Sequence, residues 1–419
     1  AGLYPPNRFP AEILSDHPER LRAVFVDSSN PANTGSDSAK FEAALKALDL
    51  LVVVDVAMTE TARLADYVLP ASSQYEKWEF TLFQFEFPTN YFHLRAPLLP
   101  PLPGTKPEPQ IYTEMAAALG ILPPESALDN LREVAATDKG AFMSAFGTLL
   151  KTNSKYAPLA PVLLTLTLGQ TLSDGASGAA ALLPGCLRVA KEHPAAVARA
   201  IGGKADDPAL GVALFDRIID SRSGTPFTVH EVEDVFGFIR HPDQKIRLAI
   251  PELLDWLLEL DPASDSADPK YPFILFAGQR RSFNANQIMR APAWRKSDPD
   301  GGLAIHPDDL DALGGTDGGW VTVETRRGQL TARAQADDRQ RRGSVALPHG
   351  YGMDVAEANG ARVVAGPRIN TLTDSADCDP IAAPPPHKTV AAALRRSSNE
   401  EVVAAEDQSR RVQAVVAAS

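Results

Sequence analysis

The chain has 419 residues, 44% of them hydrophobic, so it is long enough to bury more than one core and we expect two or three domains. Its 41 basic and 53 acidic residues give a net charge of -12, which argues against nucleic acid as a partner. Cys186 and Cys378 lie in no paired motif, so the chain alone builds neither a disulfide framework nor a cysteine-ligated metal or iron–sulfur site.

The first part of the chain predicts an open parallel sheet. An apolar run at 23–26 ends in turn-forming residues, a helix follows from Ser38, and the unbroken apolar run at 50–54 is typical of a strand buried on both faces. A further helix leads to the short apolar run at 67–69. These elements form a βαβ unit, so we expect an α/β domain over residues 1–109.

The middle of the chain changes period. Over residues 110–260 most apolar positions are three and four residues apart, which predicts a mainly helical segment. The polar, acidic stretch 261–270 is typical of a linker.

After the linker the apolar period is two. This pattern predicts a compact β-barrel over residues 271–395, and for the polar tail 396–419 it leaves disorder and a loose helix open. The strands that it predicts lie at 271–276, 321–325, 329–334 and 344–347, with one small helix at 307–313.

The ends and the apolar runs exclude two other classes of segment. No run reaches the roughly 20 apolar residues that cross a bilayer, so we expect no membrane span. The chain opens on Ala1 without a charged region followed by an apolar run, which we interpret as the interior of a longer, cytoplasmic protein.

Polar side chains follow the predicted strands of the sheet. Asn30 lies in a loop after the first strand and Asp55 ends the second, at the edge where open α/β sheets bind ligands. A carboxylate could accept hydrogen bonds from guanine or a ribose, and the Thr59 hydroxyl could meet a phosphate. Such residues after strands are more often turn and cap formers, so the structural interpretation stays open.

Taken together, these residues resemble the molybdopterin oxidoreductase family. The first part of the resemblance is carried by Ser29-Asn30-Pro31, by the apolar run that ends at Asp55, by Thr59-Glu60-Thr61-Ala62 and by residues 65–70. The second part resembles the family's C-terminal dinucleotide-binding barrel and lies at 278–286, 305–309, 318–321, 347–350 and 370–373.

The resemblance implies an α/β plus β fold, with a partial Rossmann-like parallel sheet domain, a helical middle segment and a C-terminal double-psi-type β-barrel. It implies bis-molybdopterin guanine dinucleotide with Mo or W as the cofactor. Asn30, Asp55 and Thr59 would meet a guanosine or its phosphates. The barrel's candidates share a polar or cationic side chain suited to a pterin edge or a pyrophosphate, and they are Arg280, Arg281, Asn284, Asn286, His349, Asn370 and Lys388.

These assignments have structural alternatives. Arg280 and Arg281 could be solvated charges, and Asn284 and Asn286 could cap a turn. A structural hydrogen bond is at least as frequent a role for His349 as a contact with cofactor or substrate. The other histidines lack metal-ligand spacing, so we predict no metal ligands in this chain.

The resemblance implies the cofactor-binding C-terminal portion of an oxidoreductase that acts on a small substrate such as formate or nitrate. We expect the chain alone to be inactive, because family members supply an iron–sulfur domain and the metal's protein ligand from an N-terminal segment. Its expected partners are that segment of the same subunit, an electron-transfer subunit and the small-molecule substrate. The alternative is a structural subunit of the same fold without cofactor, like the large iron–sulfur subunit of respiratory complex I, but polar residues retained around an empty cleft argue against it.

Overall fold

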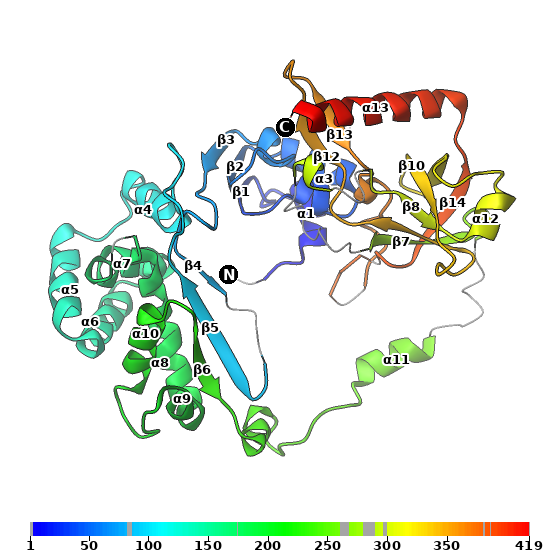
Figure 1. Cartoon of the computed structure of the whole chain (residues 1–419). Helices are drawn as coiled ribbons and strands as arrows, with labels where there is room; N and C mark the ends of the chain where they lie inside the picture. The colour runs from blue at the N-terminus through cyan, green and yellow to red at the C-terminus, as the bar shows by residue number, and fades with distance from the viewer. Residues whose placement is uncertain are drawn as a thin grey trace. The chain divides into compact units, whose positions relative to one another are not determined.

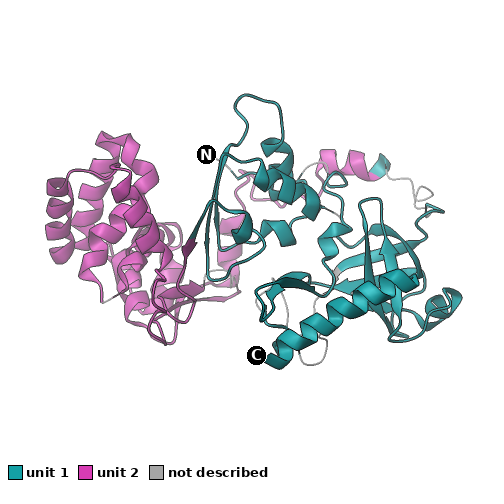
Figure 2. Ribbon diagram, turned by 90° about the horizontal axis from the view of Figure 1, so that it is seen from above, with its two compact units in different colours: residues 1–68, 258–419 teal, residues 69–257 magenta. Residues whose placement is uncertain are grey.

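The computed structural model describes residues 3–81, 86–173, 175–259, 268–279, 290–295, 300–379, 382–385 and 387–418 (Figure 1). The chain divides into two compact units, residues 1–68 with 258–419 and residues 69–257 (Figure 2). The first unit therefore joins the two ends of the chain. The predicted domain boundaries at 109, 260 and 395 stay predictions.

The first unit begins with the predicted βαβ arrangement, which the structure confirms. Its sheet has the order β1-β2-β3 and consists of β1 (Ala23–Asp27), β2 (Leu50–Asp55) and β3 (Tyr67–Pro70). β1 and β2 are parallel, with Asp27 opposite Val54, so both strands end at the same edge. The connection contains α2 (Pro31–Thr34) and α3 (Ser38–Lys46), and Leu45 of α3 packs on Leu51 and Val53 in a small apolar core.

Two strained residues flank α2 at the carboxyl edge of this sheet. Ser28 and Asp37 have φ values of 53° and 59°, in the left-handed region that side chains other than glycine seldom adopt. The Asp37 side chain also begins α3, because it accepts a hydrogen bond from the backbone N–H of Lys40. The chain thus folds back sharply on both sides of Asn30.

The barrel predicted for the C-terminal part is closed, with the order β10-β8-β11-β7-β14-β9. Its inward side chains form one core that includes Leu275, Ile305, Val323 and Leu347. The strand pairs β11–β7 and β10–β8 are parallel and the others are antiparallel. Its strands are β7 (Phe273–Gln279), β8 (Leu303–Ile305), β9 (Trp320–Glu324), β10 (Gln329–Ala336), β11 (Ser344–Pro348) and β14 (Val390–Arg396), and α12 (Pro307–Ala312) follows β8.

A hairpin and a long helix are added to the barrel. The hairpin is formed by β12 (Met353–Ala356) and β13 (Arg362–Ala365), and α13 (Asn399–Ala418) lies along it (Figure 1). Val412 of α13 packs between Val355 and Val363 of the hairpin. Of the two possibilities left open for the tail, the structure therefore has a helix. The shorter elements of this unit are η1 (Pro6–Arg8), α1 (Phe9–Ile13), η2 (Ala62–Leu64), η7 (Pro292–Trp294) and η8 (Ile369–Thr371).

The second unit combines the predicted helices with a small antiparallel sheet that the sequence did not predict. The sheet has the order β4-β5-β6, with β4 (Glu79–Thr81), β5 (Thr89–Arg95) and β6 (Thr225–Val229). The helices bury Phe142, Leu163 and Phe215 in a shared core. They are α4 (Glu108–Ala118), α5 (Glu125–Thr137), α6 (Lys139–Thr152), η3 (Ser154–Leu159), α7 (Ala160–Leu166), η4 (Leu168–Thr171), η5 (Ser177–Leu182), α8 (Leu183–Glu192), α9 (Pro194–Ile201), α10 (Leu210–Asp220) and η6 (Val232–Phe238), and α11 (Pro251–Glu259) ends the segment.

Among the helices that the structure describes, none combines the length and the apolar character needed to cross a bilayer.

Candidate functional site

Asn30 joins the carboxyl ends of β1 and β2. Its side chain is buried, and its amide Nδ2 donates to Glu60 Oε2 at 2.6 Å. Its Oδ1 accepts hydrogen bonds from the backbone N–H and the hydroxyl of Thr61, at 3.1 and 2.9 Å. Asn30 therefore fixes the loop after β1 to the residues after β2, and its predicted contact with guanosine stays a prediction.

Asp55 lies at the same edge, at the end of β2. Burial raises the pKa of this carboxyl and the negative charge of Asp27 adds to the rise, whereas backbone N–H groups of Ala57 and Val56 and the charge of Arg290 oppose it. Its Oδ1 accepts a hydrogen bond from Ala57 N at 3.2 Å. Asp55 is thus a half-buried acceptor at the strand end, and its predicted contact with guanosine stays a prediction.

Thr59 is buried at the start of the next turn. Its hydroxyl oxygen accepts a hydrogen bond from Ala62 N at 3.1 Å, which is the capping role that the sequence left open. The predicted contact of Thr59 with a phosphate stays a prediction.

Glu60 is the best-connected side chain at this edge, and the sequence did not single it out. Its side chain is 3% exposed, and Arg290 holds both carboxylate oxygens, with Nη2 to Oε1 at 2.8 Å and Nη1 to Oε2 at 3.4 Å. Asp354 N also donates to Oε1 at 2.7 Å. Burial alone would raise the pKa of Glu60, but Arg290, Asp354 N and Asn30 outweigh it and lower the pKa to about 2.

Further ion pairs continue from Glu60 to the hairpin of the barrel. Arg63 bonds to Asp354 at 2.6 Å and lies 3.3 Å from Glu60. Arg368 bonds to the other oxygen of Asp354 at 2.8 Å and lies 3.5 Å from Glu42 of α3. The carboxyl edge of the sheet and the β12–β13 hairpin are therefore joined by alternating charges.

Asn370 lies at a second junction between sheet and barrel. Its Nδ2 donates to the carbonyl of Asn33 at 2.9 Å, and its Oδ1 accepts from the Thr373 hydroxyl at 3.1 Å. Nearby, the buried Asp37 is paired with Arg327. Asn370 thus positions the loop that follows Asn30, and its predicted contact with a pterin stays a prediction.

A pocket of about 270 Å³ opens beside this junction. Ser36 and Asn7 line it, and the structure gives no hydrogen-bond partner among the described residues to Ser36 Oγ or Asn7 Oδ1, although both atoms are buried. Residues 382–385 and His387 line it too, and the pKa of His387 is lowered by burial and by the neighbouring His349. The exposed Lys388 follows directly in the sequence, and the predicted roles of Lys388 and His349 stay predictions.

The predicted Arg280, Arg281, Asn284 and Asn286 lie outside the described residues. The described residues that precede and follow them in the sequence contact two parts of the site, the pocket beside His387 and the ion pairs of Glu60. Before them, Ala277 N donates to the carbonyl of His387 at 2.7 Å, beside the pocket. After them, Arg290 is paired with Glu60 at the edge of the sheet.

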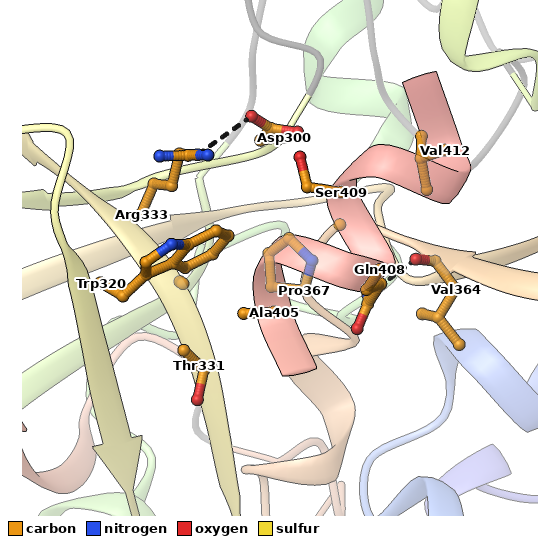
Figure 3. A pocket seen from close by; sticks show the side chains of 12 residues that line it. Asp300, Trp320, Thr331, Arg333, Val364, Pro367, Ala405, Gln408, Ser409 and Val412 are labelled. Carbon is orange, nitrogen blue, oxygen red and sulfur yellow. Dashed lines mark hydrogen bonds and ion pairs between the residues drawn. The ribbon is translucent and has the colours of Figure 1, made fainter. Parts of the chain in front are cut away.

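A second, smaller pocket lies between the barrel and α13 (Figure 3). The guanidinium carbon of Arg333 lies 4.4 Å from the centre of the Trp320 ring, and its Nε lies 3.5 Å from Asp300 Oδ2. Trp320 Nε1 and Ser409 Oγ are buried there without a hydrogen-bond partner among the described residues. The space of about 40 Å³ suits a few water molecules, which need about 10–15 Å³ each, and no predicted site residue lines it.

The fold combines a parallel sheet with a closed barrel, and two family models match those parts. The model described as Molybdopterin oxidoreductase matches residues 1–118, and that described as Molydopterin dinucleotide binding domain matches residues 273–391. Together they match more than half of the chain. The chain belongs to the molybdopterin oxidoreductase family.

Relatives match short parts of the chain. The F420-dependent formate dehydrogenase 1 subunit alpha of Methanococcus maripaludis is 42% identical over 66 residues, 16% of this chain and 10% of the relative. The assimilatory nitrate reductase catalytic subunit of Bacillus subtilis is 34% identical over 101 residues, 24% of this chain and 14% of the relative. The solved acetylene hydratase from Pelobacter acetylenicus has the same fold, with a TM-score of 0.54 and 19% identity, over 95% of this chain and 47% of that chain.

The family implies bis-molybdopterin guanine dinucleotide with Mo or W, and the described residues fit this group. Asp55 offers an acceptor for N–H donors, and Ser36 and Asn7 offer unsatisfied polar atoms to the 270 Å³ pocket, as a ring with mixed donors and acceptors needs. Within the described residues, no group of three His, Cys, Asp or Glu side chains could hold a metal ion.

Proposed function

We propose that this chain is the cofactor-binding portion of a molybdopterin-guanine-dinucleotide-dependent oxidoreductase that acts on a small substrate such as formate or nitrate. The observation that carries the proposal is that polar residues of the two segments matched by the family models contact one another. Glu60 at the sheet's carboxyl edge pairs with Arg290, and Asn370 of the barrel segment donates to the carbonyl of Asn33. Neither the family models nor the relatives support the alternative of a structural subunit that has lost the cofactor.

The bound cofactor would supply the redox chemistry through its metal, and the protein binds and orients it. Asp55 would accept N–H donors of guanine, because a carboxylate offers two oxygens to a pair of donors. The pocket beside His387 would take a pterin ring, with Ser36 and Asn7 at its polar edge. Arg280 and Arg281 would meet the pyrophosphate of the barrel-bound dinucleotide.

Two finer assignments belong to the same proposal. We infer a double-psi type for the barrel, supported by its six strands and by the parallel pairs β11–β7 and β10–β8. We also propose an electron-transfer subunit as partner, because an oxidoreductase must pass its electrons on.

Titration with GDP, which is the guanosine diphosphate part of the dinucleotide, tests the binding assignment. Calorimetry on the wild type and on Asp55→Asn is expected to show GDP binding that weakens about tenfold in the variant, roughly the loss of one charge-assisted hydrogen bond. Asp49→Asn is the matched control, because Asp49 precedes the same strand at its other end and pairs with Arg22 on the surface. Equal affinity in wild type and Asp55→Asn would overturn the role of Asp55.

The reaction is tested on protein produced in a host that makes the cofactor. Because the chain alone is expected to be inactive, it is combined with the N-terminal segment of its subunit, and oxidation of formate or reduction of nitrate, followed with an artificial electron carrier, is the expected activity. Acetylene hydration is the comparison, because the matched structure is an acetylene hydratase. Metal-loaded protein that hydrates acetylene and transfers no electrons would contradict the oxidoreductase proposal.

A further inference from the structure

One guanidinium at the edge of the sheet is paired with one carboxylate, and its charge also acts on a second. Arg290 forms a two-pronged ion pair with Glu60, at 2.8 and 3.4 Å, and both side chains are mostly buried. The charge of Arg290 also acts on Asp55, which lies at the end of the neighbouring strand. Arg290 therefore contacts Glu60, while Asp55 experiences only its charge.

The surroundings of Glu60 explain why it holds Arg290. Glu60 also accepts hydrogen bonds from Asp354 N at 2.7 Å and from Asn30 at 2.6 Å, so its carboxylate is fixed in place. A fixed, buried carboxylate that offers both oxygens matches the planar fork of an arginine better than the half-buried Asp55, which is held only by backbone N–H groups such as that of Ala57 at 3.2 Å.

We propose that Glu60 is a positioning residue that keeps the Arg290 guanidinium away from Asp55, and so leaves the Asp55 carboxylate open to the guanosine. This inference rests on the proposed function, in which Asp55 meets the guanosine. Without the charge of Glu60, Arg290 turns to Asp55, the carboxylate on which its charge already acts and which pairs with no other arginine among the described residues, and occupies the oxygens that would accept N–H donors. Glu60 thus controls affinity without touching the ligand.

The test compares Glu60→Gln with the double variant Glu60→Gln/Arg290→Gln. Glutamine keeps the size of the side chain but has no charge and replaces one acceptor oxygen with an amide N–H₂, so it cannot accept both prongs of the Arg290 guanidinium. We expect Glu60→Gln to bind GDP about tenfold more weakly by calorimetry, because one charged acceptor is lost to the ligand. The double variant has no arginine at position 290 that could pair with Asp55, so we expect its GDP affinity to return to within about threefold of the wild type.

Glu401→Gln is the matched control. Glu401 also has a pKa lowered to about 2, by an arginine, Arg395, and by Ser398, but it lies where α13 meets β14. The control loses an equivalent ion pair and should leave GDP affinity unchanged. Thermal unfolding and circular dichroism of each variant establish that the fold is kept.

A purely structural role of Glu60 would overturn the proposal, and the double variant reveals it. In that case Glu60→Gln/Arg290→Gln would bind GDP as weakly as Glu60→Gln, or more weakly. Equal affinity of Glu60→Gln and wild type would also overturn it.

A measurement without nucleotide separates this inference from the proposed function. Carbon-13 NMR of labelled aspartate should show the pKa of Asp55 lower in Glu60→Gln than in the wild type, because Arg290 moves towards it. If that pKa falls while the wild type binds no GDP, the positioning role stands and the proposed cofactor site fails. An unchanged pKa of Asp55 overturns the positioning role itself.

Discussion

Asp37 combines three roles in one side chain. It has a left-handed backbone with φ 59°, it caps α3, and its carboxylate pairs with Arg327 of the barrel. Asparagine tolerates this backbone and keeps the cap, so Asp37→Asn removes the ion pair and the oxygen that accepts from the Ser375 hydroxyl at 3.4 Å. We expect it to lower the free energy of unfolding by about 1–3 kcal/mol in urea, and Asp37→Ala to lower it further. Equal stability of Asp37→Asn and wild type would show that the pair contributes nothing.

The stability that Glu60 contributes depends on pH in a definite direction. Its pKa is about 2 in the folded protein against an ordinary 4.5, so the folded state favours the ionised form. This contribution is complete above pH 4.5 and is lost as the pH falls towards 2. The difference in unfolding free energy between wild type and Glu60→Gln, measured in urea, should therefore shrink between about pH 6 and about pH 3. A difference that grows on acidification would contradict the pairing.

At the scale of single residues, the sequence predicts where polar groups lie but not which of them pair. Asn30 and Asp55 could be placed at strand ends because strand period and turn residues fix those ends. The pair of Glu60 with Arg290 joins residues 230 positions apart, and no local pattern indicates it. The one signal was the position of Glu60 beside Thr59 in a matched motif.

Among the elements, the tight turn after α2 depends on Gly35. A Cβ atom at this position would lie 2.4 Å from the Phe41 ring and 2.7 Å from the carbonyl of Pro31. Gly35→Ala is therefore expected to lower the free energy of unfolding by about 1–3 kcal/mol, because ring and turn must shift. Gly147→Ala, inside α6 and with no atom within 4 Å, is the control and should be neutral or stabilising by up to about 1 kcal/mol. Urea unfolding of both variants checks the contrast, and equal losses would contradict it.

Apolar contacts, an ion pair and hydrogen bonds to the backbone of β13 hold the helix α13 to the hairpin. Val412 is 5% exposed against the hairpin, and Arg411 binds both oxygens of Glu357, at 2.9 and 2.6 Å. We expect Val412→Ala to lower the free energy of unfolding by about 1–3 kcal/mol and to speed hydrogen exchange along α13. Val403→Ala changes the outer face of the same helix, where 63% of the residue is exposed, and should stay within about 0.5 kcal/mol. The account of α13 fails if both variants behave alike.

Elements with a strong apolar period were predictable, and those stabilised by distant neighbours were not. β2, β9 and β10 follow such periods. β8 has only three residues, and β14 is rich in alanine, which has a low preference for strands. Neither segment therefore shows the residue pattern by which a strand is predicted from sequence. They are strands because the barrel closes around them. The helix α13 was also hard to predict, because it has no clear apolar stripe. Its buried residues are Ala405, Ser409 and Val412.

At the scale of the whole molecule, one unit is built from the two ends of the chain. Its sheet and barrel are joined by the contacts of Glu60, Asp37 and Asn370 with residues far along the chain. The sequence motifs that resemble the family lie in the same two parts. This agreement explains why the family could be predicted from motifs although the contacts that unite them could not.

The central claim, that this chain binds molybdopterin guanine dinucleotide, is tested most directly by the content of the purified protein. Protein from a host that makes the cofactor should contain Mo or W by mass spectrometry. Acid hydrolysis should release about two guanine nucleotides per metal ion, because the family's cofactor is a bis-dinucleotide. Asp55→Asn and Glu60→Gln should lower both contents, whereas Glu401→Gln should lower neither. Folded wild-type protein that contains neither metal nor guanine nucleotide would contradict the account.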